Sequence, residues 1–185
     1  MLAAANLAMV AIMAVAPVRM HEMGRSLGFV GLMVSGHIAA MFAPAPFAGF
    51  LVDRVGGRAV CTIGLLVLAV ATAVGGIVGF STTLTMALFL IGVGVGWNTA
   101  VIGGSTMLVD LLPVELRPRG EGIGEVAMGL AATAGAPGAG LVVVLGGFRA
   151  LALGAALVAL VGVAAIAGAR TISAQADSPT ATPVI

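Results

Sequence analysis

Six stretches of apolar residues, each long enough to cross a lipid bilayer, dominate this sequence and limit what it can fold into. They cover residues 2–18, 27–52, 59–80, 83–109, 122–146 and 150–169. A transmembrane helix needs about 20 apolar residues, whereas the strands of a membrane β-barrel alternate apolar and polar residues. Because these stretches are continuous, the sequence predicts an all-α integral membrane protein, a bundle of six transmembrane helices.

The composition excludes the soluble alternatives. Of the 185 residues, 61% are hydrophobic and 8% are charged, against about 45–50% and about 25% in soluble domains. The eight basic residues are all arginine, and with seven acids they leave a net charge of +1, so no basic patch for nucleic acid is expected. One cysteine and two histidines are too few for a metal cluster. We therefore expect no enzyme, no cofactor, no metal and no nucleic-acid partner.

The two ends of the chain differ from each other. The segment Ala14-Val15-Ala16 is similar to a signal-peptide cleavage site, but nothing basic precedes Arg19, which favours a transmembrane span. Residues 171–185 are small, polar and contain proline, as in disordered tails. We therefore expect one membrane domain over residues 1–170, followed by a disordered tail over 171–185.

The arginines predict an orientation in the cell membrane. An even number of spans places both termini on one side, and five arginines fall on that side against three on the other. Because cytoplasmic loops carry the excess of basic residues, we expect cytoplasmic termini and a cytoplasmic loop at residues 53–58. The five are Arg54, Arg58, Arg117, Arg119 and Arg170, and the three are Arg19, Arg25 and Arg149.

The loop after the second stretch carries the one specific motif. It resembles the signature G-x-L-x-D-R-x-G-R-[KR] of the major facilitator superfamily, which lies in the cytoplasmic turn between the second and third helices of a six-helix half. Any tight loop collects glycine, arginine and aspartate, but this order between two apolar helices favours the signature. Glycine there permits close helix approach and a short turn. The residues that carry it are Gly49, Leu51, Asp53, Arg54, Gly56, Gly57 and Arg58.

Two further segments agree with this resemblance. Residues 113–120 are similar to the charged loop between the fourth and fifth helices of such a half, and Gly147-Phe148-Arg149 to the turn before the sixth. The fourth stretch lacks the arginine of proton-coupled N-terminal halves, so the chain resembles the C-terminal half. The resemblance implies a 3+3 inverted repeat, an N-terminal six-helix half or a second copy as partner, and a lipid bilayer around both.

The resemblance also implies a gate. In the family the last arginine of the signature pairs with an acid at the cytoplasmic end of the fourth helix, and here these residues are Arg58 and Asp110. We expect a salt bridge of about 4 Å or less that closes the cytoplasmic side. We also expect Asp53 to point toward the missing half.

Polar residues inside the spans are the candidates for contact with a solute or a proton. Trp97 and Asn98 lie near the middle of the fourth stretch, where they either line a cavity or pack helices together. His37 lies inside the second stretch, and it either carries protons or bonds a backbone carbonyl. Glu125 is a proton-coupling carboxylate or, because it lies near the cytoplasmic end, part of a gate.

The resulting interpretation is a secondary active transporter of a small solute, coupled to protons, with drug efflux as one candidate activity. Transport would use alternating access between two halves, so we expect no transport from this chain alone. The alternative is a non-transporting six-helix membrane subunit or scaffold.

Overall fold

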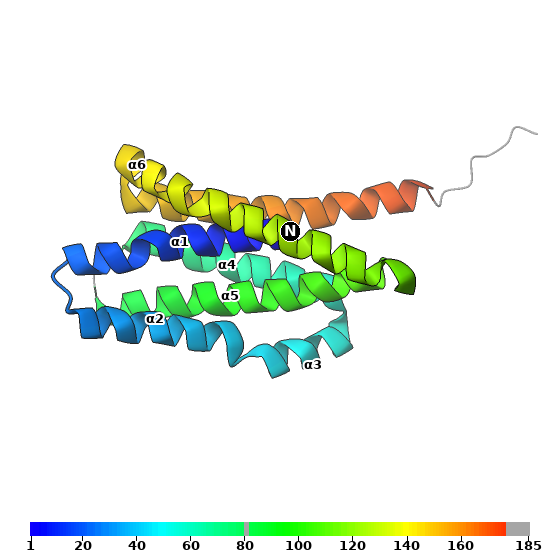
Figure 1. Cartoon of the computed structure of the whole chain (residues 1–185), viewed down its shortest axis with the longest axis horizontal. Helices are drawn as coiled ribbons and strands as arrows, with labels where there is room; N and C mark the ends of the chain where they lie inside the picture. Colours follow the sequence, from blue (N-terminus) through cyan, green and yellow to red (C-terminus); the bar gives the residue numbers. More distant parts are fainter. Residues whose placement is uncertain (80–81, 177–185) are drawn as a thin grey trace, which may run out of the picture.

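The computed structural model describes residues 1–79 and 82–176, with side chains as far as Gly168, and this part of the chain is helical without a strand. The helices, coloured along the chain in Figure 1, are α1 (Leu2–Glu22), α2 (Leu27–Phe42), α3 (Ala45–Val55), α4 (Gly57–Val78), α5 (Thr83–Asp110) and α6 (Arg117–Ala176). A short 3-10 turn, η1 (Val114–Leu116), precedes α6. By length and apolar composition, five helical segments of the described chain suit a membrane span.

The long helix α6 consists of two arms. Gly147 has a non-helical backbone, with φ 71°, and the chain reverses there (Figure 1). We call residues 117–146 the first arm and residues 148–176 the second arm. This break is the turn predicted at Gly147-Phe148-Arg149. The predicted number of six crossings counts the two arms separately, and that number stays a prediction.

The helices of the described chain differ from the expected spans at two places. The second span is not one helix, because the chain breaks between Phe42 and Ala45, where Pro44 interrupts the backbone hydrogen bonds. The second arm continues to Ala176, so it includes the first six residues of the segment expected to be disordered. The rest of that segment, 177–185, lies outside the described residues.

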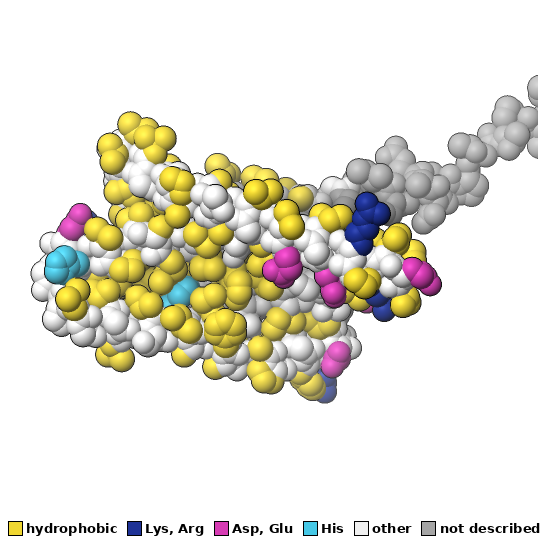
Figure 2. Space-filling model, in the orientation of Figure 1, with side chains coloured by type: hydrophobic (Ala, Val, Ile, Leu, Met, Phe, Trp, Pro, Cys, Tyr) yellow, Lys and Arg dark blue, Asp and Glu magenta, His cyan; other side chains and the backbone are white. Residues whose placement is uncertain are grey.

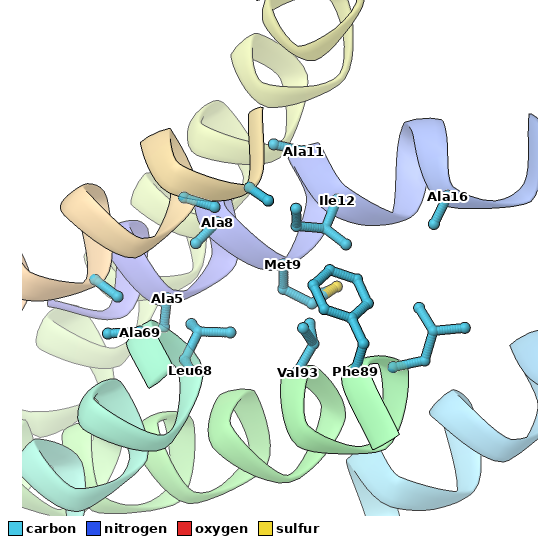
Figure 3. Packing of buried hydrophobic residues seen from close by; sticks show 14 of the residues in the cluster. Ala5, Ala8, Met9, Ala11, Ile12, Ala16, Leu68, Ala69, Phe89 and Val93 are labelled. Atoms are coloured by element: carbon cyan, nitrogen blue, oxygen red, sulfur yellow. The ribbon is translucent and has the colours of Figure 1, made fainter. Parts of the chain in front are cut away.

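The core lies where α1, α4, α5 and the two arms of α6 meet. Figure 3 shows Met9 and Ile12 of α1 directed toward Phe89 and Val93 of α5, with Leu68 of α4 beside them. These side chains are all buried. The packing of these side chains against one another fixes the relative positions of α1, α4 and α5.

Close contact between α4 and α5 depends on glycine. A Cβ atom added to Gly64 of α4 would lie 2.1 Å from the backbone nitrogen of Ala100 in α5. A Cβ on Gly103 of α5 would lie 2.3 Å from the nitrogen of Cys61. In lipid, where hydrophobic burial gives helices little reason to associate, such small residues allow the backbones to pack closely.

The surface has the polarity of a membrane protein. In Figure 2 charged side chains lie at the left end and over the right-hand part of this face, and hydrophobic side chains are spread over the middle. Among the large apolar side chains on the surface are Leu32, Phe47, Leu130 and Val144, each more than 60% exposed. Since helices satisfy their own backbone groups, such a surface is stable in the hydrocarbon layer.

The glycine contact gives the first testable prediction. We expect Gly64→Ala to lower the free energy of unfolding by about 1–3 kcal/mol, because the added methyl group must push α4 away from α5. Thermal unfolding of the chain in nanodiscs measures this effect.

Gly31→Ala is the matched control, because Gly31 lies in helix α2 with nothing within 4 Å of the added Cβ. It should leave the midpoint unchanged or raise it slightly. An equal decrease in the free energy of unfolding in Gly64→Ala and Gly31→Ala would contradict the proposed role of the α4–α5 contact.

Candidate functional site

A chain of polar contacts joins three helices near the middle of α5. The indole nitrogen of Trp97 donates to the side-chain oxygen of Asn6 in α1 over 3.0 Å. The amide nitrogen of Asn6 in turn donates to the carbonyl of Met128, in the first arm of α6, over 2.8 Å. Asn6 is 8% exposed, so it satisfies two polar groups inside the bundle.

A second set of polar contacts joins α2 to α5. His37 is buried, and its Nδ1 lies 2.8 Å from the carbonyl of Leu90. One turn further along α2, the carbonyl of Met41 accepts a 2.7 Å hydrogen bond from the amide nitrogen of Asn98. Between these contacts lies Gly94, where an added Cβ would be 2.8 Å from the carbonyl oxygen of His37. The two helices therefore touch through their backbones here.

Two buried atoms of this α2–α5 contact lack a hydrogen-bond partner, namely Nε2 of His37 and the side-chain oxygen of Asn98. Since Nδ1 of His37 faces a carbonyl, Nδ1 must carry the proton when the ring is neutral. Nε2 is then an acceptor, as is the Asn98 oxygen. Both atoms can take a hydrogen bond from a donor, such as a hydroxyl group of a solute or a water molecule.

The structure does not bring all the predicted residues together. Trp97 contacts α1 whereas Asn98 contacts α2, although they are neighbours in sequence. Glu125 is exposed on the first arm, three residues before Met128, and has no salt bridge within the described part of the chain. The candidates therefore form two separate sets of contacts, with Glu125 outside both.

The signature loop is a turn of very few residues, as predicted. Gly56, with φ 83°, ends α3, and α4 begins at the next residue. Gly57 allows α4 to approach α5 closely, because a Cβ added to it would lie 2.8 Å from the carbonyl oxygen of Gly103 in α5. Gly49 makes no such close approach, since an added Cβ would have nothing within 4 Å in the described chain.

The other signature residues lie at the surface end of α3. Asp53 and Arg54 are exposed, and Leu51 is half-buried. The guanidinium of Arg54 lies over the ring of Phe50, 4.5 Å from the centroid, in a cation–π contact. Asp53 forms no salt bridge with any described residue, and its orientation toward the other half stays a prediction.

The predicted salt bridge between Arg58 and Asp110 is absent from the described residues, where the ion pair found is Arg19–Glu22 at 3.5 Å. Arg58 instead donates from a terminal nitrogen to the carbonyl of Ile166 in the second arm of α6. The reason is the position of Arg58 at the start of α4, on the side that packs against α6 rather than α5. Asp110 is exposed.

Sequence reasoning missed Asn6. The only signal is a single amide side chain in the otherwise apolar stretch 2–18, and a polar residue in a span is costly unless another helix supplies partners. That signal was present in the sequence, but the partners, Trp97 and Met128, lie 91 and 122 residues away.

Comparison with known proteins decides the family. The sequence model of the Major Facilitator Superfamily matches residues 1–182, nearly the whole chain. The chain belongs to the Major Facilitator Superfamily. It is a multi-pass membrane protein of a transporter family, which indicates a transporter rather than an enzyme. No solved structure matches the chain significantly.

The curated relatives are all named as transporters. Two are uncharacterized MFS-type transporters of Bacillus subtilis, YddS at 33% identity over 84% of this chain and YdeG at 32% over 80%. A third is the riboflavin transporter RfnT of Brucella anthropi, at 31% over 63%. The matches cover 36%, 34% and 29% of these relatives. The chain therefore spans about a third of their length.

The Asn6 contacts can be tested through Trp97, which is the only tryptophan in a chain without tyrosine. In Asn6→Leu the indole N–H and the Met128 carbonyl lose their side-chain partner. We expect a Trp97 emission maximum at shorter wavelength and a loss of about 1–3 kcal/mol in unfolding free energy. Fluorescence of the chain in nanodiscs measures both.

The control is Thr133→Ala, which removes a hydroxyl that bonds only within its own helix, to the carbonyl of Gly129. Its emission should equal that of the original chain. An unchanged spectrum in Asn6→Leu would refute the contact between Trp97 and Asn6.

Proposed function

We propose that this chain forms half of a secondary active transporter that moves a small solute across the cell membrane. The observation that carries the proposal is the family match over residues 1–182, together with the short length of the chain relative to its relatives. A transporter of this family works by rocking two helical halves about a central site. The partner half is an N-terminal six-helix half or a second copy of this chain.

The proposed solute surface includes Trp97 and Asn98. Trp97 is partly exposed, and its N–H is already bonded to Asn6, which leaves the ring face available for apolar contact. The free side-chain oxygen of Asn98 can accept a hydrogen bond from a solute donor. An apolar ring and one acceptor suit a largely apolar or planar small molecule.

The proposed proton path uses His37 and Glu125. The free Nε2 of His37 is the atom that would take up a proton. No Asp, Glu, Lys or Arg lies on α2, and the one on α5, Asp110, lies 20 residues beyond Leu90, so the protonated ring would be an isolated charge in this conformation. Protonation of His37 would therefore favour a conformation in which α2 and α5 separate. Glu125, exposed on the first arm, is the second proposed proton carrier.

Transport is tested in proteoliposomes. Riboflavin is a suitable first solute, because one relative is named as its transporter. We expect no riboflavin flux from this chain as a monomer. With the part of RfnT that this chain does not match, we expect accumulation driven by a proton gradient. His37→Gln should abolish accumulation while solute exchange without a gradient continues.

Several outcomes would contradict these proposals. Flux by the chain as a monomer would mean that it is not a half-transporter of this kind, whereas flux by a homodimer would mean that a second copy is the partner half. Equal accumulation with His37→Gln would exclude His37 from proton coupling. If stable complexes form but carry none of a panel of solutes, including drugs, the alternative of a non-transporting subunit is favoured.

The proposed orientation places both termini and residues 53–58 in the cytoplasm. A single cysteine replacing exposed Glu115, after Cys61→Ala, should be labelled by an impermeant maleimide only when cells are opened. A single cysteine replacing Ser26 should be labelled on intact cells. Because Ser26 and Glu115 lie in opposite end loops, the reverse pattern would invert the orientation.

A further inference from the structure

The break between α2 and α3 leaves backbone carbonyls without their usual donors. In a continuous helix the carbonyls of Ala40 and Phe42 would bond the N–H groups of residues 44 and 46, but both are prolines. Backbone bonds flank the break, from the Ala43 nitrogen to the Ala39 carbonyl and from Ala48 to Pro44. In lipid such freed groups must find partners within the protein.

Asn98 bonds a third carbonyl at this break, that of Met41, whose donor in an uninterrupted helix would be the N–H of Ala45. Its amide nitrogen donates to the carbonyl of Met41 over 2.7 Å, and no backbone hydrogen bond found across the described break reaches that carbonyl. Asn98 is 4% exposed, so this bond is shielded from competing water. The end of α2 is therefore held to α5 by a side chain rather than by its own helix.

The two sides of the break are held differently. On the α2 side, His37, Gly94 and Asn98 fasten the helix to α5. On the α3 side, Ala48 is the buried residue of the helix, while Phe47 is 67% exposed and Phe50 is 50% exposed. A segment with few buried side chains and a broken hydrogen-bond ladder costs little to reorient.

We propose that the second span bends at Ala43–Pro44, and that Asn98 is the positioning residue that holds the α2 side fixed. The helix α3, which carries the signature loop, then reorients between this break and the turn at Gly56, because Gly57 at the start of α4 is held against α5. Hinges of this kind absorb their change in a few residues at the ends of helices. The use of this motion during transport rests on the proposed function, whereas the hinge itself does not.

The hinge is tested by distances between spin labels on the full chain in nanodiscs. Labels on Leu32→Cys and Phe50→Cys, both at exposed positions, span the break in a Cys61→Ala background. Their backbones would be about 27 Å apart in an uninterrupted helix. We expect one narrow distance distribution from the bent span, and in Asn98→Leu a distribution at least twofold wider.

The decisive comparison uses a background in which Pro44 and Pro46 are both alanine. There the N–H groups return, the span straightens, and Asn98→Leu should widen the distribution by less than a fifth. Ser35→Ala, an exposed polar site on α2, is the matched control and should change neither background.

Asn98→Leu could fail to fold while the prolines are present. If replacing both prolines by alanine then restores folding, the effect of Asn98→Leu depends on the prolines, which supports the proposal. Equal widening by Asn98→Leu with and without the prolines would overturn it, as would no widening in either. None of these readouts requires a solute, so a failure of the hinge and a failure of transport remain distinguishable.

Discussion

The backbone hydrogen bonds of a chain in lipid must be satisfied within the protein, and the rest of this structure depends on that constraint. It makes every span a helix, and it makes every interruption of a helix a place that needs a specific solution. At Gly56 and Gly147 the chain turns through a left-handed glycine, so that one helix ends and the next begins almost at once. At the break before Pro44, the side chain of Asn98 from another helix donates a hydrogen bond to the carbonyl of Met41.

The glycines of this chain divide by what they touch. Gly64 and Gly103 bring the α4 and α5 backbones into contact, and Gly94 does the same between α2 and α5. At Gly31 on α2 and Gly129 on the first arm of α6, an added Cβ would have nothing within 4 Å in the described chain. A glycine lowers helix stability unless a neighbour makes use of the space.

The sequence was sufficient for the class of fold and the family, because apolar length and the signature are local properties. Asn6 and Arg58 show where local reasoning ends. The structural role of Asn6 depends on a hydrogen bond from a tryptophan 91 residues away. The spacing of apolar and polar residues along the sequence does not predict such a pair. The resemblance to the family gave Asp110 as the expected partner of Arg58. Arg58 lies on the side of α4 that packs against α6, so its guanidinium donates to the carbonyl of Ile166 instead.

The two turn glycines occupy corresponding places in the two halves of the bundle. Gly56 joins the second and third helical spans, Gly147 joins the two arms of α6, and each is followed two residues later by an arginine, Arg58 or Arg149. This is the pattern expected of a 3+3 inverted repeat. The repeat is broken by proline, because the first arm of α6 stays helical through Pro137, whereas Pro44 and Pro46 divide the second span. Pro137 removes one backbone donor. Pro44 and Pro46 remove two, namely the donors of the Ala40 and Phe42 carbonyls, which flank the carbonyl of Met41. The asymmetry therefore gives the first triplet a hinge that the second lacks.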